Sequence, residues 1–499
     1  MVLLAAASAS ADDDQRHGAP RVVLLASPGA GHLIPLAEMA RRLATDHHGV
    51  APTLVTFAGA AATAEYSAVL SSLPASVATA RLPAVPFDDL PADAPVEAVL
   101  FELVRRSLPS LRDLLLRWSQ TGAVAALVPD FFCVAALTVA EELGVPGYVF
   151  LPCSLAALAV MRRAVELHDG DNGDGDYRAL PDPLELPGGV SLVNADLPNE
   201  FRYATSPVYG QLIETGRLYR RAAGILSNTF QSLERAVVED MSQKGTGFPP
   251  VYAVGPFVRS SSDEESSSAC LEWLDKQPAK SVVFVSFGSG GTLSVSQTRE
   301  LAAGLEMSGH RFLWIVRMPS LNGEAFTFRR NGVGVGDADI DDPLDFLPDG
   351  FVERTRDRGL AVAAAWLPQV RVLGHDATAA FVSHCGWNST LESVSAGVPM
   401  VAWPLHAEQR MNAVILEDSV GVALRPRRRE AAAVIGREEI AAAVKEVMEE
   451  EGRGGGVRRR AREMKEEAAR AWSPEGSSRR ALEEVAGKWK AAAAAAASK

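Results

Sequence analysis

The chain has 499 residues and a formal net charge of −13, and its 47% hydrophobic and 22% charged residues are ordinary proportions for a soluble globular protein. A single hydrophobic core stops growing at roughly 250–300 residues, so this length predicts two domains. The acidic balance argues against general binding to nucleic acids or anionic membranes, because both require a basic surface. No apolar run approaches the roughly 18–20 residues of a membrane-spanning helix.

We predict that the first 20 residues form a disordered extension. Their apolar part is short, has no basic segment before it and is followed by three aspartates, so it is not typical of a signal peptide. The four cysteines are scattered and form no Cys-x-x-Cys pair; they are Cys133, Cys153, Cys270 and Cys385. Scattered thiols of this kind indicate a reducing compartment, and we therefore expect a cytoplasmic protein.

The first predicted strand covers residues 21–26 and leads through a glycine-containing turn, residues 27–32, into a helical pattern. Strand, glycine turn and helix form the opening unit of a nucleotide-binding α/β domain. The turn has two glycines but Ile34 in the place of the third glycine of a dinucleotide fingerprint, which makes it a weak NAD or FAD motif. His32 leaves this turn where the carboxyl ends of parallel strands open into a crevice, and it is a candidate for chemistry.

Strands and helices alternate through the rest of the chain. Further strands are predicted at residues 54–57, 123–128, 147–151, 225–229, 251–254, 281–287 and 311–317, and helices at residues 96–118, 438–450, 457–472 and 477–490. This alternation indicates parallel, doubly wound sheets. A serine-rich charged segment separates two α/β halves. The predicted divisions are an extension (1–20), an N-terminal domain (21–258), a linker (259–269), a C-terminal domain (270–472), a C-terminal helix (473–490) and a low-complexity tail (491–499).

Two Asp-x-Asp pairs raise the question of a metal. An Asp-x-Asp pair can hold a divalent ion against a diphosphate. The pairs Asp174-x-Asp176 and Asp337-x-Asp339 both lie in acidic, glycine-rich stretches without a flanking strand. Such composition is typical of solvated loops, and we expect no metal and no other cofactor.

The most informative stretch covers residues 366–409. In it a short apolar run precedes a glycine, after which Asn388 and Ser389 can open a helix that runs to Gly397. A helix start presents unpaired N–H groups and the positive end of a dipole, so it binds phosphate well. Ser389 and Glu392 also match a capping box, in which two side chains satisfy backbone donors without a ligand. The residues alone leave both interpretations open at this helix start.

Other side chains of the same stretch favour a ligand. Trp366 offers an indole face for stacking on a base, and Gln369 offers an amide for pairing with the edge of that base. Glu408 and Gln409, at the end of the stretch, are of the type that binds sugar hydroxyls. Groups suited to a base, a phosphate and a sugar within one stretch predict a nucleotide sugar as the ligand.

Residues 366–409 resemble the signature box of the plant secondary-product glycosyltransferases, the UDP-sugar-dependent family that glycosylates small molecules. The resemblance implies the GT-B architecture, an α/β fold of two Rossmann-like domains that face each other across a cleft, with the acceptor on the N-terminal domain and UDP-sugar on the C-terminal domain. It implies donor contacts from Ser27, Ser289, Trp366, Leu367, Gln369, His384, Trp387, Asn388, Ser389, Glu392, Glu408 and Gln409. In this family a glutamine at the end of the box goes with glucose, so Gln409 favours UDP-glucose.

The resemblance also implies a reaction. It assigns His32 as the general base of an inverting transfer that yields a β-glucoside, without a metal. The glycine turn, residues 407–412 and residues 423–426 most resemble the hydroquinone glucosyltransferases (arbutin synthases), whose acceptors are small phenols and phenylpropanoids. We expect a monomer whose acceptor pocket is built from loops of the N-terminal half, including Phe87, Phe131, Phe132, Leu155 and Phe201.

One position departs from the family pattern as we align it. The family has an aspartate, eight residues after the equivalent of Asp130, that orients the catalytic histidine, and this chain has Thr138 there. Threonine can accept a hydrogen bond from the ring but supplies no charge to stabilise an imidazolium. We therefore expect a weaker base that prefers acidic hydroxyls such as phenols. Two alternatives remain open: a UDP-sugar-binding protein without catalysis, and a nicotinamide oxidoreductase.

Overall fold

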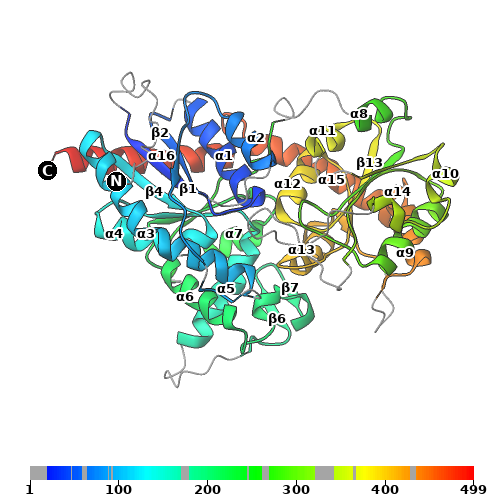
Figure 1. Cartoon of the computed structure of the whole chain (residues 1–499), viewed down its shortest axis with the longest axis horizontal. Coiled ribbons are helices and arrows are strands. Elements are labelled where there is room, and N and C mark those ends of the chain that lie inside the picture. Colours follow the sequence, from blue (N-terminus) through cyan, green and yellow to red (C-terminus); the bar gives the residue numbers. More distant parts are fainter. Residues whose placement is uncertain are drawn as a thin grey trace.

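The computed structural model of the protein describes residues 19–45, 48–58, 64–87, 89–91, 94–169, 179–243, 247–260, 269–320, 342–363, 367–426 and 434–498. Trp366, both Asp-x-Asp pairs and most of the serine-rich linker lie outside the described residues. Figure 1 shows two α/β domains, one coloured from blue to green and the other from green to orange. The two-domain α/β architecture expected from the sequence is confirmed.

The N-terminal domain is built on parallel strands. The strands β3, β2, β1 and β4 pair in that order and span Ala78–Leu82, Ala51–Phe57, Arg21–Leu25 and Val124–Pro129. The strands β5, β8 and β9 continue the order and span Tyr148–Leu151, Gly224–Ser227 and Val251–Ala253, with parallel bridges that join β5 to β4. Almost every residue of β1, β4 and β5 is buried, as a sheet covered by helices on both faces requires.

Helices cover both faces of this sheet (Figure 1). They are α1 (Ala30–Thr45), α2 (Ala64–Ser71), α3 (Val96–Thr121), α4 (Leu137–Glu142), α5 (Leu155–Asp169), α6 (Pro207–Tyr219) and α7 (Arg235–Met241). Short 3₁₀ turns are η2 (Phe131–Ala136), η3 (Asn194–Asp196) and η4 (Asn199–Phe201), and β6 (Leu184–Leu186) pairs with β7 (Val190–Leu192) as an antiparallel hairpin.

The C-terminal domain repeats the plan. Its strands pair in the order β12 (Gly359–Ala363), β11 (Arg311–Val316), β10 (Val282–Ser286), β13 (Thr378–Ser383), β14 (Met400–Ala402) and β15 (Ala423–Leu424). Its helices are α8 (Ala269–Leu274), α9 (Val295–Ser308), α10 (Phe351–Thr355), α11 (Gln369–Gly374), α12 (Trp387–Ala396), α13 (Gln409–Val414), α14 (Arg437–Met448) and α15 (Gly452–Ala471), with the 3₁₀ turn η7 (Pro343–Phe346) and the π turn η8 (Ile415–Val420).

Both sheets reverse their strand order at one point, and these points place the site. In the N-terminal sheet the reversal lies between β1 and β4, and in the C-terminal sheet it lies between β10 and β13. The crevice outside the carboxyl ends of such strands is where doubly wound folds bind ligands. We therefore expect the functional side chains in the segments that follow β1, β4, β10 and β13.

The last helix, α16 (Ser477–Ala497), lies along the N-terminal domain (red in Figure 1). It packs on β4 and β9, and Trp489 meets Tyr148 edge-on with ring centroids 5.6 Å apart. α16 continues to Ala497 and buries Ala493, so the alanine run of the low-complexity tail forms the last turns of this helix. No helix in the described part of the chain is both long and apolar enough to span a bilayer.

Candidate active site

A cavity of about 350 Å³ lies between the two domains, at the carboxyl ends of both sheets. Among the residues that the sequence predicted for the site, those lining it are His32, Phe131, Phe132, Phe201, Ser289, Leu367, Gln369, His384, Trp387, Asn388, Ser389, Glu392 and Glu408. Ser27, Phe87, Thr138, Leu155 and Gln409 do not line it. The structure thus brings together segments that are more than 300 residues apart in the sequence.

His32 lies in the first turn of α1 and forms a pair with Asp130, which directly follows β4. Its Nδ1 is 3.0 Å from Oδ2 of Asp130, whose side chain is fully buried. The same carboxyl oxygen accepts hydrogen bonds from the Ser27 main chain at 2.9 Å and the Ser27 hydroxyl at 2.6 Å, and Oδ1 accepts the Cys133 N–H at 3.2 Å. The carboxylate is therefore fixed by the protein alone.

The negative charge of Asp130 determines which ring nitrogen of His32 carries the proton. Burial alone would raise the pKa of Asp130, but the hydrogen bond and charge interaction with His32 and the hydrogen bonds from Ser27 hold that pKa below its ordinary value. An ionised Asp130 accepts the Nδ1 proton of His32, which leaves Nε2 as the nitrogen able to take a proton. It also stabilises the imidazolium that forms when Nε2 does so.

Two sequence predictions are corrected here. The hydroxyl of Thr138 donates to the carbonyl of Ala135 at 2.7 Å, so Thr138 is not the partner of His32, and Asp130 fills that role. The expectation of a weakened base loses its basis. Ser27 is fully buried behind Asp130 and not at the donor end of the cavity, because its hydroxyl is used to hold the carboxylate.

The start of α12 forms the donor end of the cavity. The helix begins at Trp387 with Gly386 as its N-cap and no side-chain cap, so the capping box, one of the two interpretations of this helix start, is not formed at Ser389. The first helical hydrogen bond runs from the Thr390 N–H to the Gly386 carbonyl. The N–H groups of Trp387, Asn388 and Ser389 precede that bond and are available to an anion.

The side chains around this helix start are joined in a small network. The Gln369 amide donates to the Ser389 hydroxyl at 2.9 Å and to a Glu392 carboxyl oxygen at 2.5 Å. All three side chains line the cavity. Glu392 is thereby held at the first turns of α12, where a ribose of a bound nucleotide would lie if its diphosphate met the N–H groups.

His384 directly follows β13 and lines the donor end of the cavity. Gly288, at φ +74°, and Gly386 leave room for its ring, since a Cβ on them would lie within 2.7 Å and 2.4 Å of it. Burial, with smaller effects of His406 and Arg317, lowers the pKa of His384 to about 3, so the ring is neutral. Within the described residues its Nδ1 has no hydrogen-bond partner.

Two donor-end side chains also join the domains. The indole N–H of Trp387 donates to the main-chain carbonyl of Asn228 at 2.8 Å, and the amide of Asn388 donates to the Gly31 carbonyl at 2.9 Å. Gly31 directly precedes His32 in the sequence. The buried Oδ1 of Asn388 has no partner in the described structure. The donor helix is therefore bonded to the turn that carries the histidine.

The turn before α13 carries Glu408 and Gln409. Burial raises the pKa of the Glu408 carboxyl, while its own main chain, His32 and Asn412 partly offset that rise. Gln409 is only 4% exposed, and its amide oxygen accepts the N–H groups of Leu405 and His406 at 2.9 and 3.0 Å. Gln409 therefore stabilises the turn before α13 through main-chain hydrogen bonds, whereas the sequence predicted that it binds the sugar.

Aromatic side chains form the acceptor end. Phe131 and Phe132 meet edge-on, with ring centroids 4.9 Å apart, and the Phe132 ring lies 5.2 Å from that of His32. Leu155 does not reach the cavity, because its side chain is fully buried in the core at the start of α5. Two carboxyl groups that the sequence did not indicate, Glu97 and Glu200, also line this end.

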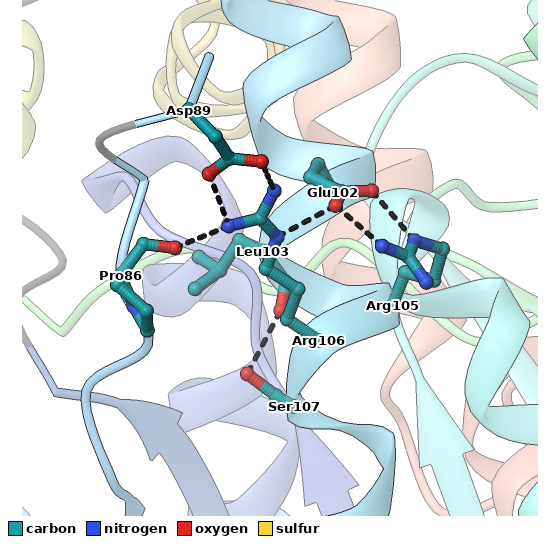
Figure 2. Close-up of polar contacts among 7 residues, drawn as sticks. All are labelled: Pro86, Asp89, Glu102, Leu103, Arg105, Arg106 and Ser107. Carbon is teal, nitrogen blue, oxygen red and sulfur yellow. Dashed lines mark hydrogen bonds and ion pairs between the residues drawn. The ribbon is translucent and has the colours of Figure 1, made fainter.

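The loop before α3 is fixed by one arginine. Figure 2 shows the Arg106 guanidinium bonded to both carboxyl oxygens of Asp89, the carbonyl of Pro86 and the carboxyl of Glu102, at 2.5 to 2.7 Å. Phe87 lies under the same guanidinium, 5.5 Å from it, and so is not in the cavity. This contact set anchors the loop beside the helix whose first turn holds Glu97.

No group of three or more histidine, cysteine, aspartate or glutamate side chains suited to a metal occurs among the described residues. The Asp-x-Asp pairs are outside that part of the chain. The groups available to an anion at this end of the cavity include main-chain N–H groups, the neutral imidazole of His384 and the guanidinium of Arg317.

Comparison with known proteins identifies relatives of this chain in sequence and in structure. The sequence profile of the family described as UDP-glucoronosyl and UDP-glucosyl transferase matches residues 258–454. A hydroquinone glucosyltransferase from Rauvolfia serpentina is 42% identical over 474 residues, which cover 94% of this chain and 98% of that protein. The structure of Phytolacca americana UGT2 complexed with UDP-2fluoro-glucose and pterostilbene has a TM-score of 0.83 at 40% identity and covers 95% of this chain and 100% of that one.

A second solved structure is similar to this chain over nearly the same length. It is the complex between 3,4-dichloroaniline and a UDP-glucosyltransferase from Polygonum tinctorium capable of glucosylating indoxyl, with a TM-score of 0.83 at 40% identity, covering 95% of this chain and 99% of that one. These matches extend over both domains and confirm the GT-B architecture. With two Rossmann-like sheets, a histidine after β1 and a phosphate-type helix start after β13, the chain belongs to the plant UDP-sugar-dependent glycosyltransferases.

Proposed function

We propose that this enzyme transfers glucose from UDP-glucose to a hydroxyl of a small phenolic or phenylpropanoid acceptor, with inversion, to give a β-glucoside. The observation that carries the proposal is the His32–Asp130 pair, whose histidine lines the same cavity as the start of α12. The preference for glucose and for phenols is supported by the relatives, among them a hydroquinone glucosyltransferase and a complex with UDP-2fluoro-glucose. Gln409 lends no direct support to it, because its amide is bonded within its own turn.

In the proposed reaction Nε2 of His32 takes the proton of the acceptor hydroxyl as the oxygen attacks the anomeric carbon. The new carbon–oxygen bond forms on the face opposite the bond to UDP, which breaks and leaves its electron pair on the diphosphate. Attack from the opposite face inverts the anomeric centre. Asp130 stabilises the imidazolium through Nδ1.

The departing diphosphate gains negative charge that the protein must stabilise. The N–H groups of Trp387, Asn388 and Ser389 and the helix dipole behind them face that charge. Neutral His384 adds a further donor, and Ser289 lines the same part of the cavity. Because main-chain donors serve the leaving group, we expect a chelator such as EDTA to leave the rate unchanged; loss of activity restored by Mg²⁺ or Mn²⁺ would contradict this.

The test is release of UDP from UDP-glucose with hydroquinone and other simple phenols. Wild type should turn over, and His32→Ala should lose roughly 10²–10⁴ in kcat, the usual contribution of a general base. Calorimetry should show UDP bound equally by both proteins, which verifies that the variant is folded. An α-configured product, or a His32→Ala variant as fast as wild type, would overturn the mechanism.

The alternative of a binding protein without catalysis is not favoured. It rested on the absence of a carboxylate beside His32, and Asp130 supplies that carboxylate. UDP-glucose binding without UDP release on any phenol would be the result that restores it.

A further inference from the structure

The cavity holds carboxyl groups from three different elements. Glu97 comes from the first turn of α3, Glu200 from η4 and Glu408 from the turn before α13, and all three line the cavity. Arg317 is the one lysine or arginine among the described lining residues, and it belongs to the C-terminal domain next to His384. The acceptor end is therefore apolar with an acidic edge.

Glu200 is held in place from both sides. Pro198 and Phe201 on either side of it also line the cavity, and the Phe201 N–H closes the turn onto the Pro198 carbonyl at 2.9 Å. Asn199 accepts a hydrogen bond from Arg410 of the C-terminal domain at 2.7 Å. The mechanism above makes no use of Glu200, yet Glu200 lines the cavity in a turn that is fixed on both sides.

The surroundings of Glu200 disfavour a second negative charge. Burial raises the pKa of Glu200 to about 7, its own main-chain N–H offsets part of that rise, and the carboxylates of Glu97 and Glu408 raise the pKa further. A buried carboxyl group in such a site gains from a hydrogen-bond donor or a cation and loses when another carboxylate approaches.

We propose that Glu200 determines acceptor specificity: it hydrogen-bonds an amino or hydroxyl group of the acceptor remote from the hydroxyl that is glucosylated, and it excludes acceptors that carry a carboxylate at that place. This inference rests on the proposed function of the same cavity. It names the acceptor class as phenols with a neutral or cationic second polar group, and it disfavours phenolic acids.

The test uses three phenols of similar length that differ in charge at one end: tyramine, which carries an ammonium, tyrosol, which carries a hydroxyl, and 4-hydroxyphenylacetate, which carries a carboxylate. For wild type, kcat/KM should be lowest for the carboxylate by roughly tenfold or more, because like charges at a desolvated contact repel. Glu200→Gln should reduce that ratio several-fold, and Glu200→Lys should reverse the order of the ammonium and the carboxylate.

Glu185→Gln is the matched control. It removes a carboxylate from the same domain, at an exposed position on β6 where the side chain accepts a hydrogen bond from Ser191. The control should keep the wild-type ratios. A merely structural role of Glu200 would change all three acceptors equally, so unchanged ratios in Glu200→Gln and Glu200→Lys would overturn the inference.

Failure of this inference can be separated from failure of the proposed function. Turnover of tyrosol by wild type with unchanged ratios in the variants rejects the role of Glu200 alone. Absence of UDP release with every phenol rejects the proposed function, and calorimetric affinities of the three phenols in the presence of UDP still measure the ratios. Equal ratios in wild type and Glu200→Lys there would reject the role of Glu200 as well.

Discussion

The two halves of the cavity differ in how their polar groups are satisfied. On the acceptor side, Asp130 receives hydrogen bonds from Ser27, His32 and Cys133. On the donor side, Nδ1 of His384 and Oδ1 of Asn388 are buried without a partner in the described residues. The His32–Asp130 pair is thus fully hydrogen-bonded within the protein, whereas the donor side keeps buried polar atoms that the described residues leave unpaired. Changes to the first half should therefore affect turnover, and changes to the second half should affect binding.

The largest effect is expected at Asp130. Asp130→Asn keeps the shape of the side chain but removes the charge and favours the wrong tautomer of His32, so kcat should fall by roughly 10²–10⁴. The affinity for UDP, measured by calorimetry, should not change. Thr138→Val is the control, because the Thr138 hydroxyl contacts the Ala135 carbonyl and not the histidine. Equal losses in the two variants would contradict the assignment of Asp130.

Gly288 offers the corresponding test of the donor half. In Gly288→Ala the new Cβ would lie 2.7 Å from the His384 ring, so the ring must move and UDP affinity should fall about tenfold, the loss of one hydrogen bond to a charged group. Gly309→Ala has the same φ of +74° but meets no atom within 4 Å, so it carries the same backbone strain without the clash. Calorimetry with UDP should separate the two; equal affinities would show that His384 does not bind the donor.

The neutral state of His384 makes stability depend on pH. Its pKa is about 3 in the folded protein against an ordinary 6.5, so the unfolded chain binds a proton below pH 6.5 that the folded chain does not. The stability that comes from neutral His384 is present above pH 6.5 and is lost as the pH falls toward 3. Between pH 7.5 and pH 5 wild type should lose about 1–2 kcal/mol more free energy of unfolding than His384→Gln.

Urea unfolding at the two pH values measures this difference. His406, whose pKa burial and Arg410 lower to about 4, contributes with the same sign in both proteins, so the difference between them reports mainly on residue 384. Identical pH dependence of wild type and His384→Gln would show that residue 384 is not held neutral.

The smallest effect is expected at the acceptor loop. Arg106→Ala removes the contacts to Asp89 and Pro86 drawn in Figure 2, and the KM for the acceptor should rise about two- to fivefold, since surface ion pairs contribute little. The affinity for UDP should stay the same. Arg105→Ala is the control, because Arg105 bonds to Glu102 within α3 and not to the loop. A change of KM in both variants would indicate a general loss of helix stability.

The sequence predicted which segments form the two ends of the cavity, but it did not predict which partners their side chains bond to. His32 was predicted from its place after the first strand, and the phosphate-type helix start was found within one residue of its true beginning at Trp387. In the sequence analysis Asp130 served only as the reference position from which Thr138 was counted. Its role follows from β1 and β4 being neighbours in the sheet, and linear spacing does not show which strands are neighbours.

The direction in which each side chain points was the second feature that the sequence did not predict. Ser27, Leu155 and Gln409 all lie within a few residues of the cavity, but each turns into the protein, toward Asp130, the core of α5 and the turn before α13 respectively. Glu200 had no signal in the sequence, because it lies in a 3₁₀ turn outside every motif. Proximity along the chain predicted the right segments, and packing decided which atoms face the ligand.

The return of the chain through α16 has a mechanical consequence. The domains are connected twice, once between β9 and α8 and once between α15 and α16. Two domains joined by a single connection can rotate relative to each other about any axis. Two connections restrict the relative rotation of the domains mainly to the axis that passes through both connections. Any rotation that separates the two domains at the cavity must break the hydrogen bonds from Asn388 to Gly31 and from Trp387 to Asn228, because both join one domain to the other.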